Sequence, residues 1–168
     1  MATPNRPDLT TNRSENREDV SRREKAIFTR AETPFRLLVV DDEPDIREVT
    51  SAMLAEDGYE VLTARDGQEA LEILPQFRPD LVVTDLRMPR LSGFELLKIM
   101  RERFPRLPVI AVSGDFSGQE MPPNITADAF ISKGCSYFEP LAIKIKELLS
   151  ATAIARNANA GNDPGAND

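Results

Sequence analysis

The chain has 168 residues, of which 40% are hydrophobic, and it carries a net charge of −7 with one cysteine and no histidine. The acidic balance argues against non-specific binding to nucleic acid or to an anionic membrane, and no apolar run approaches the roughly 18 residues of a membrane span. The lack of histidine excludes histidine-based acid–base catalysis, histidine metal sites and a role as a phosphohistidine carrier. Because the lone Cys135 has no internal disulfide partner, we expect a reducing cytoplasm.

Both ends of the chain are polar. Residues 1–34 interleave charges of both signs and are predicted to be a mostly disordered arm, in which 14–31 could form a short helix. The arm has no apolar core of the kind that a signal peptide needs. Residues 152–168 are small and polar and are predicted to be a disordered tail, so we expect one folded domain over 35–151.

The domain opens with the run RLLVVD at 36–41, which is typical of a strand buried on both faces of a parallel sheet. A helix is expected over 43–58, because Pro44 suits its first turn and Gly58 its left-handed C-terminal position. The apolar residues expected on the inward face of this helix are Ile46, Val49, Met53 and Leu54.

A second strand is predicted over 60–64, followed by a short helix over 66–74. Asp66 and Glu69 have the spacing of a capping box, and Pro75 is expected to stop the helix. The remaining predicted elements are strands over 80–85, 107–113 and 128–132 and helices over 92–104 and 136–151.

Strands that alternate with helices at these lengths predict right-handed βαβ units and a parallel sheet covered on both sides. Ligands of such sheets bind outside the carboxyl ends of the strands. The polar residues at these ends are Asp41 and Asp42 after the first strand, Asp85 after the third, Ser113 after the fourth and Lys133 after the fifth.

Two unit charges about 4 Å apart repel by roughly 4 kcal/mol at an effective dielectric of 20, so the Asp41–Asp42 pair needs a compensating partner. Mg²⁺ fits, because it takes one or two carboxylates, several waters and a phosphate oxygen. A carboxylate beside it can become the nucleophile that forms an aspartyl phosphate, with Lys133 and Ser113 as partners of the phosphoryl oxygens. Taken singly, each residue has a plainer interpretation: the acid pair as helix caps, Asp85 as a turn acid, and Lys133 as a surface cation.

Four segments, LLVVDDEPDIRE, VVTDLRMPRLSGFELL, VIAVSG and ADAFISKG, resemble the receiver domain of two-component response regulators. The resemblance covers 36–150. It implies a flavodoxin-like, doubly wound α/β fold, in which a five-stranded parallel sheet has the strand order 2-1-3-4-5.

The resemblance also implies the roles of the acidic residues. Asp85 resembles the phosphoacceptor. The Mg²⁺ ligands would be Asp41, Asp42, Asp85 and the backbone carbonyl of Arg87.

Three further residues match positions that sense the phosphoryl group. Ser113 resembles the switch hydroxyl, Lys133 the phosphate-sensing lysine, and Phe130 the aromatic whose rotamer reports phosphorylation, although Phe130 taken alone is expected to be core. The family usually has a cis proline after the lysine, where this chain has Gly134.

The segment between the fourth and fifth strands also departs from the family. It contains Pro122 and Pro123 and has no apolar stripe, so the family's fourth helix is expected to be degenerate or missing. Our hypothesis is an irregular loop over 115–127 that becomes ordered on phosphorylation together with Ser113.

These observations favour a stand-alone phosphoacceptor response regulator that receives a phosphoryl group from a sensor histidine kinase or phosphotransfer protein, with Mg²⁺ as cofactor. We expect a signalling protein and not an enzyme, apart from its self-catalysed phosphorylation and dephosphorylation. The expected partners are that phosphodonor and a downstream protein whose identity the sequence does not give, with no nucleic acid and no membrane, and the chain is expected to be a monomer or weak dimer in the cytoplasm.

Two alternatives stay open. A receiver-like interaction module could signal without phosphorylation, although such a module has no need to retain the acid set. An Asp-nucleophile phosphatase on a similar sheet is disfavoured, because such enzymes use Asp-x-Asp after the first strand, where this chain has Asp41-Asp42.

Overall fold

The structure, a computed structural model, describes residues 34–114, 125–134 and 136–160. The helix proposed over 14–31, the rest of the arm to residue 33, and residues 115–124 of the proposed loop lie outside the described residues, as do Cys135 and the tail from 161.

Five parallel strands form one sheet in the order β2-β1-β3-β4-β5, as the resemblance predicted. Their register brings the carboxyl ends together: Val40 pairs with Ala64 and with Thr84, and Ser113 pairs with Ser132. The strands are β1 (Arg36–Val40), β2 (Glu60–Ala64), β3 (Leu81–Asp85), β4 (Val109–Ser113) and β5 (Ala129–Ser132).

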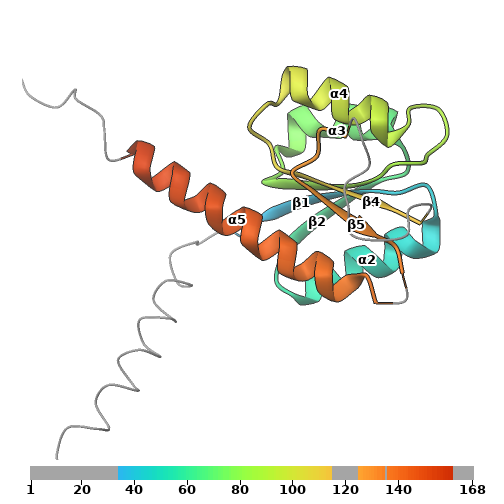
Figure 1. Ribbon diagram of the computed structural model, residues 1–168, viewed down its shortest axis with the longest axis horizontal. Helices are drawn as coiled ribbons and strands as arrows, with labels where there is room; N and C mark the ends of the chain where they lie inside the picture. Colours follow the sequence, from blue (N-terminus) through green and yellow to red (C-terminus); the bar gives the residue numbers. More distant parts are fainter. Residues whose placement is uncertain (1–33, 115–124, 135, 161–168) are drawn as a thin grey trace, which may run out of the picture. The chain divides into compact units, whose positions relative to one another are not determined.

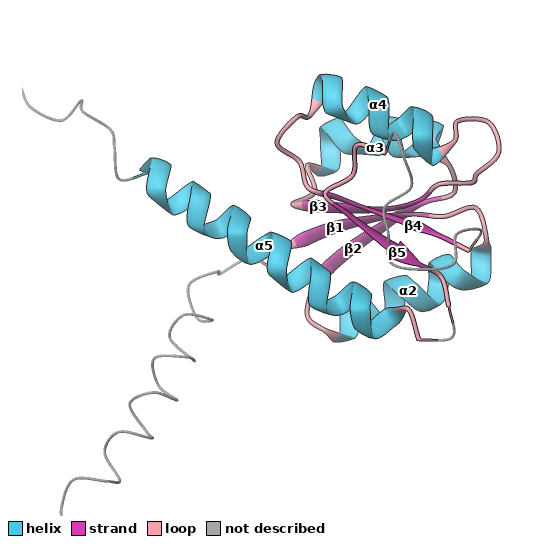
Figure 2. Ribbon diagram, viewed as in Figure 1, coloured by secondary structure: helices cyan, strands magenta, loops and turns pink. Residues whose placement is uncertain are grey.

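Helices cover both faces of the sheet (Figures 1 and 2). On one face, α3 (Gly67–Phe77) and α4 (Gly93–Arg103) pack over a cluster that includes Leu38, Val82 and Phe130. On the other face, α2 (Pro44–Glu56) and α5 (Phe138–Ala160) pack over a cluster that includes Leu37 and Val83. Successive strand residues therefore enter opposite cores, which explains why the strands read as continuous apolar runs.

The inward face of α2 differs from the prediction. Leu54 and Thr50 are buried, at 4% and 2% exposure, whereas Val49 and Met53 are 47% and 42% exposed. Thr50 can turn inward because its hydroxyl finds a hydrogen-bond partner, so its polarity does not keep it in water.

Two helix ends were also predicted wrongly. Pro75 does not stop α3, which continues to Phe77 and ends at a left-handed Arg78 (φ 50°). Pro75 lies in the last turn, where the helix forgoes one backbone hydrogen bond while Phe77, 4% exposed, is buried in the core. At the other end of the domain, α5 continues to Ala160, so residues 152–160 are helical and do not belong to a disordered tail.

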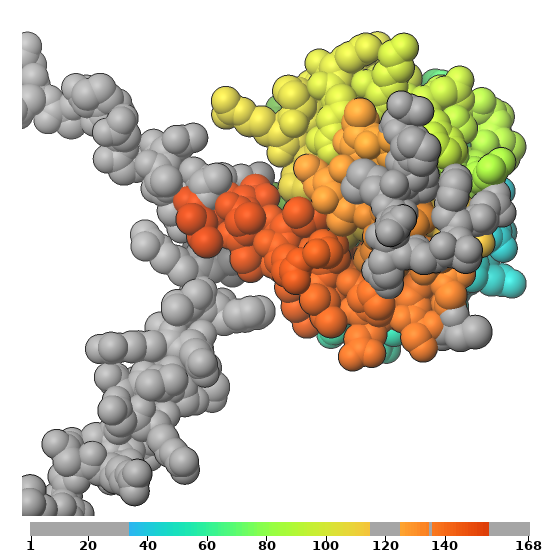
Figure 3. Space-filling model, viewed as in Figure 1, coloured from blue at the N-terminus to red at the C-terminus, as the bar shows by residue number. Residues whose placement is uncertain are grey.

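Part of α5 contributes to the surface, in orange to red in the space-filling view (Figure 3). Leu141, Ile145 and Leu149 are buried against the sheet, while Ile143 and Ile154 are 52% and 71% exposed. Within the described residues, no helix combines the length and the apolar character that crossing a membrane requires.

The described residues between β4 and β5 contain no helix, and Arg101 of α4 holds the point where they lead into β5. Its guanidinium donates to the carbonyls of Thr126 (2.5 Å) and Leu107 (3.2 Å) and to the Asp128 carboxylate (2.6 Å). The same Asp128 oxygen accepts the Val109 amide at 2.7 Å. One planar cation thus joins α4, β4 and the start of β5.

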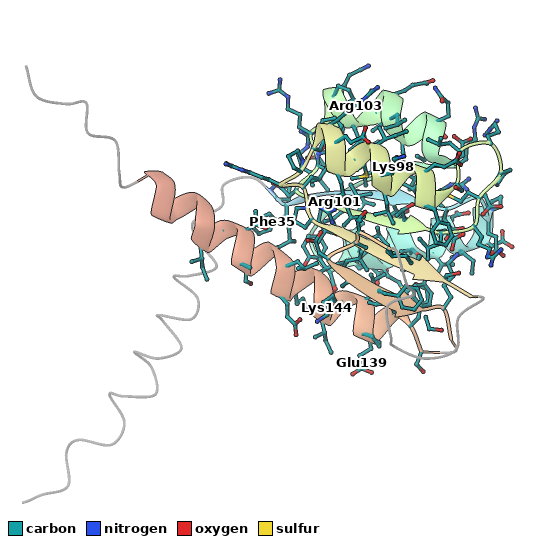
Figure 4. All side chains as sticks on the ribbon, turned by 45° about the horizontal axis from the view of Figure 1, so that its top comes forward. Phe35, Lys98, Arg101, Arg103, Glu139 and Lys144 are labelled. Carbon is teal, nitrogen blue, oxygen red and sulfur yellow. The ribbon has the colours of Figure 1, made fainter. Side chains whose placement is uncertain are left out.

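We expect Arg101→Lys to lower the free energy of unfolding by about 1–2 kcal/mol, because a lysine ammonium cannot make these forked contacts together. Urea unfolding measures the change. The matched control is Arg103→Lys at an exposed position of the same helix (both residues are labelled in Figure 4), where a change within about 0.5 kcal/mol is expected. Equal effects of the two substitutions would contradict a stabilising role for the Arg101 contacts with Thr126, Leu107 and Asp128.

Candidate functional site

Three strands deliver buried polar groups to one edge of the sheet. Asp41 follows β1, Asp85 is the last residue of β3, and Ser113 is the last residue of β4, with exposures of 3%, 4% and 1%. Polar groups are expensive to bury. Among the described residues, the other buried polar side chains are those of Thr50, Asp66 and Thr84. The grouping of Asp41, Asp85 and Ser113 at one edge therefore marks a site.

Lys133, directly after β5, supplies the cation of the site. Its ammonium lies 2.7 Å from one Asp41 carboxylate oxygen and 3.1 Å from an Asp85 oxygen. The exposed Glu43 is farther away, at 3.9 Å. One ammonium is therefore shared by two buried carboxylates from two different strands.

The electrostatics of this triad are asymmetric. Burial raises the pKa of the Asp85 carboxyl, and the charge and hydrogen bond of Lys133 only partly oppose that rise. Burial alone would lower the pKa of Lys133, but its hydrogen bond to Asp41 and the charges of both acids outweigh burial and raise it. The two directions agree physically, because Lys133 divides its charge between two acids and stays charged, while Asp85 remains undercompensated.

The donor set suits a hard cation. Asp41 and Asp85 share only one ammonium, and the half-buried Asp42 adds a third acid, so the edge retains excess negative charge. Within the described residues, no group of three or more His, Cys, Asp or Glu side chains forms a ready cage for a metal. This arrangement fits Mg²⁺, which uses few protein carboxylates and keeps several waters.

The loop after β3 is built closely around Asp85. The Arg87 amide donates to the second Asp85 carboxylate oxygen at 2.9 Å, and the Thr84 hydroxyl donates to the Asp85 carbonyl at 2.9 Å. A Cβ on Gly93 would lie 2.0 Å from that carbonyl oxygen, so only glycine allows α4 to start here. Ser92 caps α4 through the predicted capping box with Glu95.

A second tie holds the same loop against α3, and the sequence did not indicate it. Asp66 caps α3 by accepting the Glu69 amide at 2.9 Å, as predicted, and it also forms an ion pair with Arg90. Arg90 adopts a left-handed conformation (φ 66°) that side chains seldom take. The Gly67 amide donates to the Leu91 carbonyl at 3.2 Å, so the loop is fixed at two points.

The three residues that match the family's sensing positions lie in or directly after β4 and β5. The backbone carbonyl of Ser113 accepts a hydrogen bond from the Lys133 amide at 2.8 Å, which links the ends of β4 and β5. Phe130 is 6% exposed and lies in the cluster beneath α3 and α4. The described residues contain no cis peptide bond, and the Gly134 amide donates to Ser132 at 2.9 Å, so the turn after Lys133 differs from the family's usual one.

One buried contact near the site was missed entirely. The hydroxyls of Thr50 in α2 and Tyr137, just before α5, lie 2.5 Å apart. They are 87 positions apart in the sequence, and no local pattern pairs them.

The sequence of this chain is similar to those of known response regulators. The family model for the response regulator receiver domain matches residues 37–139. A probable transcriptional regulatory protein, TcrX of Mycobacterium tuberculosis, is 33% identical over 123 residues, which are 72% of this chain and 52% of TcrX. Response regulator RR06 of Streptococcus pneumoniae is 44% identical over 101 residues, 59% of this chain and 46% of RR06. The chain thus spans about half the length of the curated relatives it matches.

Solved structures agree over the same region. The receiver domain of the Francisella response regulator 1452 is 31% identical with a TM-score of 0.64, covering 70% of this chain and 98% of that one. Response regulator TrrA of Thermotoga maritima, solved in complex with Mg²⁺ and BeF, is 36% identical with a TM-score of 0.63, covering 68% of this chain and 98% of that one. The match over 37–139, the strand order and these likenesses show that the chain belongs to the response regulator receiver domain family of two-component systems.

Proposed function

We propose that this chain is a phosphoacceptor response regulator in which Asp85 receives a phosphoryl group from a histidine kinase or phosphotransfer protein. The observation that carries the proposal is the buried Asp85 carboxylate, held at 3.1 Å by Lys133 and at 2.9 Å by the Arg87 amide. A fixed, undercompensated carboxylate at a strand edge is a suitable nucleophile for phosphorus.

In the proposed step, an ionised Asp85 oxygen attacks the phosphorus of a phosphohistidine. The new bond is P–O, the P–N bond breaks, and the leaving imidazole takes up a proton. Lys133 stays protonated and stabilises the charge on the phosphoryl oxygens, and the buried Ser113 hydroxyl donates a hydrogen bond to one of them in the proposed phosphorylated state. Hydrolysis reverses the modification: water attacks the phosphorus and releases phosphate from Asp85.

Asp41, Asp42, Asp85 and the Arg87 carbonyl are the proposed ligands of Mg²⁺. When bound, the ion supplies positive charge to the phosphoryl oxygens. Asp41 is fixed for this role by its neighbours: its carboxylate accepts the Glu43 amide at 3.0 Å, and its carbonyl accepts the Arg47 guanidinium at 2.7 Å.

The product of the reaction is a changed surface that a downstream protein reads, so we propose a signalling protein and not an enzyme with a turned-over substrate. The proposed setting is the cytoplasm. Action as a stand-alone monomer or weak dimer stays a prediction, and so does the lack of nucleic-acid binding by this acidic chain. The receiver-like module that signals without phosphorylation is disfavoured by the intact triad.

A small-molecule phosphodonor such as acetyl phosphate, with Mg²⁺, is expected to add one phosphoryl group per chain, and Asp85→Asn is expected to abolish the addition. Intact mass spectrometry measures both. The matched control is Asp57→Asn, at an exposed acid after α2, which should label like the wild type. Undiminished labelling of the Asp85 variant would refute the assignment.

Asp42→Ala is expected to weaken Mg²⁺ binding by about tenfold or more, and to raise stability slightly in metal-free buffer because a like charge is removed. The increase in melting temperature with Mg²⁺ concentration reports the affinity. Asp45→Ala, in the first turn of α2, controls for the loss of a nearby exposed charge. A marked loss of metal-free stability in the Asp42 variant alone would identify Asp42 as a structural cap.

Asp85→Asn is also expected to stabilise the metal-free fold at pH 7. Because the folded-state pKa of Asp85 is raised, ionisation costs stability as the pH rises through that pKa, and asparagine avoids this cost. We expect a higher melting temperature at pH 7, with the difference vanishing below about pH 3.9, where the carboxyl is neutral in both folded and unfolded states. A lower melting temperature at pH 7 would mean that attraction to Lys133 outweighs burial.

A further inference from the structure

The Thr50–Tyr137 contact lies next to the site but is not part of the receiver machinery described above. Thr50 is 2% exposed and Tyr137 7% exposed, and their hydroxyl oxygens are 2.5 Å apart. A hydrogen bond of this length between two buried hydroxyls satisfies both groups and fixes the distance between the segments that carry them.

Each segment leads directly to one half of the Lys133–Asp41 ion pair. Thr50 lies in α2, the helix that follows Asp41 and returns to it through Arg47, whose guanidinium donates to the Asp41 carbonyl. Tyr137 lies four positions after Lys133, and its amide donates to the Gly134 carbonyl at 3.3 Å. The Thr50–Tyr137 hydrogen bond therefore links the helix that follows Asp41 to the segment that follows Lys133, while the ion pair links Asp41 to Lys133 directly.

The Tyr137 phenol interacts electrostatically with charged residues of the site. Burial raises the pKa of Tyr137, whereas its hydrogen bond with Thr50 and the charge of Lys133 lower it; the charges of Asp41 and Asp85 raise it further. Its ring also stacks on that of Phe138, with centroids 4.2 Å apart, which limits its movement.

The backbone after Lys133 contains a glycine, whose conformational freedom the Thr50–Tyr137 hydrogen bond can limit. Gly134 follows the lysine in a trans linkage, and a Cβ at Gly134 would meet nothing within 4 Å. Glycine in open space leaves the backbone more conformational freedom than any other residue. The Lys133 and Gly134 amides donate to the Ser113 and Ser132 carbonyls, and a side-chain tie beyond Gly134 adds a restraint on the segment that carries the ammonium.

We propose that the Thr50–Tyr137 hydrogen bond positions Lys133 by fastening the loop after β5 to the helix that follows the acidic pair. Tyr137 is a positioning residue, because it acts through Lys133 and does not contact the reacting atoms. The inference rests on the proposed function for its consequence in phosphoryl transfer, but the position of the ammonium can be tested without it.

The key variant is the double substitution Thr50→Val with Tyr137→Phe. It removes both hydroxyls, keeps nearly the same volume and leaves no buried hydroxyl without a partner, so the fold is expected to survive. The matched control is Tyr59→Phe. Tyr59 is the other of the two tyrosines in the chain and precedes β2, at the opposite edge of the sheet. Thr50→Ser keeps a hydroxyl at position 50 and is the conservative rescue.

The first measurement needs no phosphodonor. The NMR signal of the Lys133 ammonium, assigned through Lys133→Met, is expected in the wild type, in Tyr59→Phe and in Thr50→Ser, because a hydrogen-bonded buried ammonium exchanges slowly with water. In the double variant we expect this signal to broaden beyond detection. An unchanged signal in the folded double variant would overturn the proposal.

The second measurement is the rate of labelling by acetyl phosphate, where the double variant is expected to be about tenfold slower than the wild type. In a Lys133→Ala background the same double substitution should cause no further loss, since the hydrogen bond acts through the lysine. Losses that multiply would show a purely structural role and overturn the proposal. If the wild type does not label at all, the proposed function fails, and the ammonium signal alone decides the positioning role.

Discussion

The structure depends on one buried ammonium that two buried carboxylates share. Asp41 and Asp85 are almost fully removed from water, and Lys133 is the cation within ion-pair distance of both. Removing a charge from water costs several kcal/mol even after relaxation, and the lysine offsets part of that cost for both acids, together with the backbone amides of Glu43 and Arg87. The arrangement leaves a net negative charge at the edge, which favours the proposed binding of Mg²⁺ and the proposed role of Asp85 as a nucleophile.

Strand order explains why the cation needs a long side chain. β5 is separated from β3 by β4, and neighbouring strands lie about 4.8 Å apart, so Lys133 starts two strand spacings from Asp85. The lysine ammonium nevertheless lies 3.1 Å from an Asp85 oxygen, a separation that the long lysine side chain spans.

Much of the fold followed from the sequence because its signals are local or topological. Alternating apolar runs and capped helices predicted the parallel sheet, and the rule that ligands bind at the carboxyl ends of the strands predicted that Asp41, Asp85 and Lys133 lie together, as they do. The errors have a different physical origin. Hydrophobicity alone placed Val49 and Met53 inward, but the rotation of α2 is set by packing and by the partner of Thr50, which lies 87 positions away. The continuation of α3 through Pro75 likewise depends on the burial of Phe77, which tertiary packing provides.

The edge strand β5 is the element through which a change at the site could reach both cores. It pairs with β4 alone, so one ladder holds it, and its residues alternate between the two clusters: Phe130 enters the one beneath α3 and α4, and Ile131 enters the other. Side chains secure the two ends of this strand. Arg101 clamps Asp128 just before β5, and Thr50 holds Tyr137 beyond Lys133. Lys133 follows β5 directly, and its ammonium lies 3.1 Å from an Asp85 oxygen. If Asp85 carries a phosphoryl group, as proposed, the lysine would face a larger negative charge, and the side chains of β5, which alternate between the two clusters, connect this strand to both faces of the sheet.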